Sequence, residues 1–101
     1  MKDLNTRLKN SAVVRNLSED IDAFSNEDFP GAYTIPLHYS FKCHRLDIAN
    51  YATAILYVTV NDIKYPIKPN TAYPVVSSGG FTDILIESNV EPNFMGTVSI
   101  C

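Results

Sequence analysis

The stretch Y-T-I-P-L-H-Y-S-F-K, residues 33–42, alternates between apolar side chains and polar or small ones at every position. Its apolar members are the odd-numbered residues, Tyr33, Ile35, Leu37, Tyr39 and Phe41. Successive side chains of an extended strand point to opposite faces, so this spacing puts all of them on one face of a sheet. The stretch therefore predicts a long amphipathic strand with one face on a core, as in an antiparallel sheet.

The apolar positions change parity just after this strand. Leu46 and Ile48 are even-numbered, whereas the preceding apolar set is odd-numbered. A shift of one residue moves every side chain to the other face of a sheet. We therefore expect a bulge or a corner at residues 43–45, where the chain is re-aimed.

The middle of the chain predicts a hairpin. Residues 54–60 are apolar on both faces and rich in β-branched residues, which favours a central strand covered on both sides. Asn61 and Asp62 follow as a two-residue turn, and residues 63–67 resume alternation. Pro66 cannot donate to a ladder, so it places this second strand at an edge or a bulge.

The remaining segments predict further strands separated by turns. Residues 68–71 contain Pro at the second position of a turn, and residues 77–80, S-S-G-G, read as a flexible hairpin turn. Strands are expected at residues 72–76, 81–86 and 97–101.

The chain is accordingly predicted to be all-β, an antiparallel β-sandwich or small barrel of about seven or eight short strands. Parity predicts that the core centres on Ile35, Leu37, Tyr39, Phe41, Leu56, Val58, Ile84, Ile86, Val98 and Ile100.

Residues 1–16 are predicted to be an N-terminal arm and residues 17–101 the β-sandwich domain. The arm carries scattered charge and too few apolar positions to form a helix that is stable by itself. We expect it to bind a neighbouring subunit through Leu4 and Leu8, with Arg7 and Lys9 available to carboxylates. A short strand is expected at residues 12–14 and a short helix near residues 18–25.

Length and charge narrow the class of protein. With 101 residues, 46% of them hydrophobic, the chain is expected to be one domain. Its net charge of −3 and dispersed basic residues disfavour nucleic-acid binding. No window approaches the ~18 apolar residues of a membrane span, and no signal peptide is visible. We therefore expect a protein made in a cytoplasm, with Cys43 and Cys101 reduced.

No catalytic or cofactor motif stands out in the sequence. His38, Cys43 and His44 lack the paired spacing of zinc sites, and parity points His38 and Cys43 to opposite faces. The acidic residues Asp20, Asp22, Glu27 and Asp28 lack EF-hand spacing and are expected to be a solvated turn. We expect neither enzyme activity nor a metal or other cofactor.

The pattern of the second half of the chain resembles a known class of viral protein. The segments I-L-Y-V-T-V-N-D-I-K-Y-P-I-K-P-N-T-A-Y, G-G-F-T-D-I-L-I-E-S and G-T-V-S-I look like the small β-sandwich proteins of tailed-bacteriophage virions. These are decoration (cement), head-fibre-base and neck or tail accessory proteins. The resemblance covers residues 54–101 and implies a structural role in the virion, without functional residues to carry over.

Two functions are therefore expected, in order. The first is a non-enzymatic virion structural protein, present in many copies or as a homo-oligomer, that binds neighbouring capsid or connector subunits. The alternative is a carbohydrate- or receptor-binding module. Exposed loop aromatics at Tyr51, Tyr73 and Phe94 would favour the alternative, because sugars and partner proteins stack on such rings.

Overall fold

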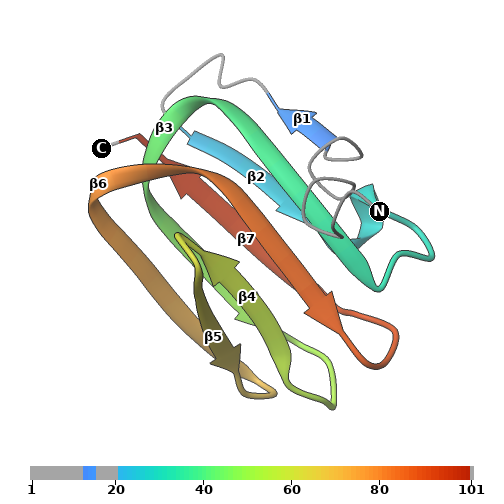
Figure 1. Cartoon of the computed structure of the whole chain (residues 1–101). Helices are drawn as coiled ribbons and strands as arrows, with labels where there is room; N and C mark the ends of the chain where they lie inside the picture. The colour runs from blue at the N-terminus through green and yellow to red at the C-terminus, as the bar shows by residue number, and fades with distance from the viewer. Residues whose placement is uncertain (1–12, 16–20, 101) are drawn as a thin grey trace, which may run out of the picture.

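The computed structural model describes residues 13–15 and 21–100 (Figure 1). Over these residues the chain is all-β, as predicted, and its strands pair into one continuous sheet. Neither a sandwich of separate sheets nor a barrel is confirmed. The elements are β1 Val13–Arg15, β2 Ile21–Ser25, the 3-10 turn η1 Asn26–Asp28, β3 Thr34–Asn50, β4 Leu56–Val60, β5 Ile63–Ile67, β6 Thr71–Ser88 and β7 Phe94–Ser99.

The sheet is organised around the two long antiparallel strands β3 and β6, which both bend in the middle (Figure 1). The strand order is β2-β7-β3-β6-β4-β5, and β1 pairs in parallel with β3. We call the part built by β2, β7, the second half of β3 and the first half of β6 the β7 half. The part built by β1, the first half of β3, the second half of β6, β4 and β5 is the β4 half.

The predicted parity change is confirmed, and it lies at the bend of β3. The β3–β6 register shifts between His38 and Cys43 and again between Cys43 and Arg45. Leu46 and Ile48 are buried beyond the shift, as is Cys43 within it. An irregularity in the ladder thus lets one strand supply buried residues of odd number before the bend and even number after it.

The predicted hairpin turn at residues 77–80 is wrong, because these residues continue β6. Gly80 has a φ of 82°, a left-handed conformation that favours glycine. A Cβ built on Gly80 would lie 3.2 Å from side-chain carbons of Lys42 and His44. The glycine therefore bends β6 without a break at the place where β3 bends beside it.

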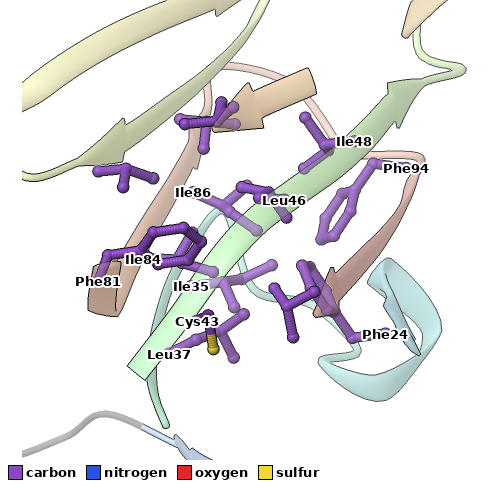
Figure 2. Packing of buried hydrophobic residues seen from close by; sticks show 14 of the residues in the cluster. Phe24, Ile35, Leu37, Cys43, Leu46, Ile48, Phe81, Ile84, Ile86 and Phe94 are labelled. Atoms are coloured by element: carbon purple, nitrogen blue, oxygen red, sulfur yellow. The ribbon is translucent and has the colours of Figure 1, made fainter. Parts of the chain in front are cut away.

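The buried side chains of both halves pack into one core (Figure 2). Most of the predicted core residues are buried, and Ile100 is half-buried against the core. Phe41 is 54% exposed and Tyr33 48% exposed, so both predicted positions on the core face are wrong. Phe41 lies within the register shift, where alternation is interrupted, and Tyr33 precedes the first residue of β3.

The β4–β5 hairpin forms as predicted. Asn61 and Asp62 both have positive φ, 52° and 65°, as a type I′ turn requires, and β5 with Pro66 is an edge strand. The predicted turn at residues 68–71 is also confirmed, with a hydrogen bond from Thr71 N–H to the Lys68 carbonyl oxygen and a φ of 59° at Asn70. The alternating burial of β4 shows that it is not covered completely on both sides.

Asn50 is the buried polar residue of the described core. Its side-chain amide donates to the carbonyl oxygens of Ala54 and Ile67, both at 2.9 Å. Its Oδ1 accepts a hydrogen bond from Ala52 N–H at 2.9 Å. One side chain thus holds the loop after β3 to the end of β5.

In β7, Gly96 lies beneath an aromatic ring. Gly96 pairs with Phe24 on β2 and with Ile48 on β3. The Phe24 ring is buried and meets Phe94 edge to face, with ring centroids 6.0 Å apart. A Cβ on Gly96 would lie 2.4 Å from Phe24 Cζ, so the Phe24 ring occupies the space that a side chain at position 96 would fill.

The described part of the N-terminal region contains two strands. Val13–Arg15 pairs with residues 37–39 of β3, which confirms a short strand here. The predicted helix near residues 18–25 is wrong for Ile21–Ser25, which is a strand because alternate residues bring Phe24 into the core and Asp22 to the Tyr39 hydroxyl, 2.9 Å away. The proposed arm contacts Leu4, Arg7, Leu8 and Lys9 lie outside the described residues, as does Cys101. The boundary at residue 16 stays a prediction.

Candidate protein-binding face

The outer surface of the β7 half is a regular sheet face that no described segment covers. We define the open face as the outward residues of its four strands. They form three cross-strand rows, which are Ile21, Ser99, Arg45 and Val76; Ala23, Thr97, Asp47 and Pro74; and Ser25, Met95, Ala49 and Ala72. Residues directly opposite in an antiparallel pair share a face, so the registers fix the membership of each row.

The open face is largely apolar and its large apolar side chains are exposed. Val76 is 67% exposed, Ile21 59% and Met95 56%. Small or apolar residues and hydroxyl side chains occupy most other positions. The three large apolar side chains stand at separate places on the face, with Ser99, Thr97, Arg45 and Asp47 between them. Several exposed apolar side chains gathered on one face are a candidate interaction site, whereas single ones need no explanation.

The charges of the open face neutralise one another. Arg45 Nε lies 2.8 Å from Asp47 Oδ2, and Arg45 Nη2 lies 3.0 Å from Asp47 Oδ1. The hydrogen bonds to Asp47 and its negative charge raise the pKa of Arg45 above its ordinary value. Because the pair leaves the open face with no net charge, a strong electrostatic field does not select the partner of this face.

The outer surface of the β4 half is different in character. His38 Nδ1 lies 2.8 Å from Asp83 Oδ1, across the β3–β6 ladder. Lys64 Nζ lies 3.6 Å from Glu87 Oε1 and 5.4 Å from the centroid of the Tyr57 ring. Polar and charged cross-strand contacts of this kind are typical of a solvated sheet surface. The contrast identifies the open face as the better candidate for binding another protein.

The predicted loop aromatics have different outcomes. Tyr51 is 52% exposed and Tyr73 44% exposed, and the Tyr73 ring lies beside Tyr65 with centroids 5.6 Å apart. Phe94 is fully buried, so its prediction as a loop contact is wrong. It begins β7 and points to the core, where it packs against Phe24.

His38, Cys43 and His44 have separate surroundings. His38 faces outward with Asp83, Cys43 is buried, and His44 Nδ1 lies 3.0 Å from the Ser77 carbonyl oxygen. Burial, followed by the charge of Asp22, raises the pKa of the Cys43 thiol to about 11. Such a thiol is protonated at neutral pH and is a poor nucleophile.

Two other features of the described residues bear on ligand binding. Residues 13–15 and 21–100 contain no group of three or more His, Cys, Asp and Glu side chains placed to hold a metal ion. A hollow of about 320 Å³ lies beside η1 and the loop before β7, with Phe29, Pro30 and Pro92 in its walls and the carboxylates of Glu27 and Glu91 at its side. Both carboxylates are exposed, and the half-buried Asn26 side chain in the lining already accepts a hydrogen bond from Phe94 N–H, so the hollow lacks a buried polar group free to orient a ligand.

The sequence did not reveal the open face. Its rows join strands that are far apart in the chain, and the sequence predicts a helix, not a strand, at Ile21 and Ala23. Alternation in residues 45–49 and 72–76 was the available signal, because it separates Arg45, Asp47 and Val76 from the buried Leu46 and Val75.

Among the residues that the structure describes, no helix has the length and apolar character of a membrane span. Neither a protein-family model, nor a curated protein, nor a solved structure matches the chain.

Proposed function

We propose that the chain is a non-enzymatic structural protein of a virion that binds neighbouring capsid or connector subunits. The open face carries this proposal. Seven of its twelve positions are apolar and it has no net charge, and it is presented on a regular ladder whose paired backbone resists deformation. Such a surface matches a flat protein partner better than it matches a small ligand, which needs a concave site.

The assignment to a virion rests on the resemblance of residues 54–101 to small phage structural proteins. The residues of that resemblance span the β4–β5 hairpin, β6 and β7, and its Gly-Gly turn lies inside β6 rather than between two strands. The net charge of −3 favours a protein partner over packaged nucleic acid.

The proposal is tested on virus particles released by cells that carry the gene for this chain. Gradient-purified particles are analysed by quantitative mass spectrometry, and the chain is expected in fixed proportion to the major coat protein. A Val76→Lys variant supplied in place of the natural chain is expected to be lost from particles. Ile63→Lys is the matched control, because Ile63 is 54% exposed on β5 in the other half of the sheet. Absence of the chain from every particle fraction refutes the proposal.

The exposed tyrosines favour a second candidate, a carbohydrate- or receptor-binding module. Tyr51 and the Tyr65–Tyr73 ring pair offer surfaces on which a sugar can stack. A glycan array probed with the purified chain tests this candidate. Binding that is lost in Tyr51→Ala or Tyr73→Ala, with folding retained, would favour it over assembly.

A further inference from the structure

We propose that the open face binds the same face of a second copy of this chain, about a two-fold axis that crosses β3 between Arg45 and Asp47. The inference rests on the proposed assembly function and names the partner of that face. It follows from how the charged and the apolar residues are distributed over the rows.

The charges on the open face are self-complementary. Arg45 and Asp47 are two residues apart on one strand, on the same side of the sheet, and belong to adjacent rows. A two-fold axis in the plane of the interface and perpendicular to β3 reverses the strand direction. It brings Arg45 of one copy opposite Asp47 of the other, and Asp47 opposite Arg45. Each copy thus meets opposite charge, as an isologous interface requires.

The apolar residues of the same rows are complementary in size. The operation that pairs Arg45 with Asp47 also faces the first row with the second row of the other copy. Ile21 then lies over Ala23, and Val76 lies over Pro74. On β2 and on β6 a large side chain of one copy thus meets a smaller side chain of the other, so the two faces can approach without large residues colliding.

The size of the face sets the strength of the dimer. Because the axis lies between the first and second rows, these two rows of each copy overlap and the third row, with Met95, does not. Strands about 4.8 Å apart and rows about 6.8 Å apart give four strands and two rows a plan area of about 260 Å². Stable interfaces bury roughly 800 Å² of accessible surface on each partner. Accessible area exceeds plan area because side chains project, but the overlap is about a third of the usual area, so this interface is weak. We expect a concentration-dependent dimer, favoured where many copies are held together.

Sedimentation equilibrium of the purified full chain over a wide concentration range tests the inference. The average mass is expected to rise from 11.3 kDa toward twice that value. Ile21→Lys and Val76→Lys should each weaken self-association by roughly tenfold or more, because each buries an ammonium group against apolar side chains. Ile63→Lys should leave it unchanged, and circular dichroism checks that all variants fold.

A charge exchange tests the axis itself. The R45D chain carries two carboxylates at this place and the D47R chain two guanidinium groups, so each should be monomeric alone. Their equimolar mixture should form a heterodimer, because all facing charges are then opposite.

The result separates this inference from the proposed function. A chain that stays monomeric at every concentration, dimerises despite Val76→Lys, or shows no heterodimer in the mixture overturns the two-fold dimer. The same chain found in purified particles would still support the assembly function.

Discussion

Gly96→Ala should destabilise the protein although alanine adds only one methyl group. The new Cβ would lie 2.4 Å from Cζ of Phe24 and less than 3.0 Å from two further ring atoms, Cε1 and Cε2. Ordinary carbon contacts begin near 3.5 Å, so the ring or β7 must move by about 1 Å. The ring is buried, at 2% exposure, and Phe94 stands beside it.

The size of the effect is the difference between two terms. Overpacking of a core costs about 1–3 kcal/mol. Replacing glycine with alanine at a compatible backbone stabilises by about 0.4–1 kcal/mol, through the unfolded chain. Gly96 does not have positive φ, so the backbone adds no further cost. The free energy of unfolding should therefore fall by about 1.3 kcal/mol at the middle of these ranges, within limits of about 0 and 2.6 kcal/mol.

Urea unfolding of four proteins measures this. These are the natural chain, Gly96→Ala, Phe24→Leu and the double variant. Phe24→Leu removes the ring atoms that the new methyl would meet, so the double variant should be less destabilised than the sum of the single effects. A coupling energy of at least about 0.5 kcal/mol is expected for residues in contact. Full additivity, or a Gly96→Ala variant more stable than the natural chain, would refute the packing of Phe24 over Gly96.

Three further predictions concern single residues. Phe41→Ala should change the free energy of unfolding by no more than about 0.5 kcal/mol, because Phe41 is 54% exposed. In the same urea assay Leu37→Ala should cost about 2–5 kcal/mol, and an equal loss in both variants would place Phe41 in the core. Asn50→Ala should lower the thermal midpoint, since it leaves the carbonyl oxygens of two backbone groups without their amide donor, at a cost of about 1–3 kcal/mol for each buried unsatisfied group; an unchanged midpoint would contradict this. The pKa of the folded Cys43 thiol is raised from 9.0 to about 11, so between these values the folded state keeps a proton that the unfolded chain loses. The stability that Cys43 contributes is therefore fully present below pH 9 and is lost as pH rises toward 11, with a slope of at most about 1.4 kcal/mol per pH unit. Cys43→Ala should remove that part of the pH dependence of stability, and identical pH profiles of the two proteins would refute it.

Much of the fold could be predicted because its signals are local. Alternation in residues 33–42 predicted the first half of β3, and the parity change at Leu46 predicted its bend. The turn at Asn61 and Asp62 needs only two residues in a left-handed conformation, and Asn and Asp adopt it readily. Each of these features depends on neighbours in the sequence.

The errors have one physical origin, which is dependence on a distant strand. Phe41 keeps the alternation of its segment but lies in a register shift set by β6. Gly80 looks like part of a turn, yet β6 continues through it, at the point where the register with β3 shifts between Val76 and Phe81. Ile21–Ser25 has helix-like spacing and becomes a strand by pairing with β7. The open face itself exists only through the registers of four strands, so single-strand patterns could not reveal it.

The two long strands also join the two halves of the sheet into one cooperative unit. β3 pairs with β6 in both halves of the sheet, from Thr34↔Glu87 to Asn50↔Thr71. The two halves share both β3 and β6, so loss of the β3–β6 hydrogen bonds in one half displaces strands that also form the other half. Partners so distant in the chain must also meet before either half can form, which slows folding. The chain should therefore open and close as a single cooperative unit, with amide hydrogens on both sides of the bend exchanging together, and a load applied to the open face in an assembly would be carried through the backbone into the β4–β5 hairpin.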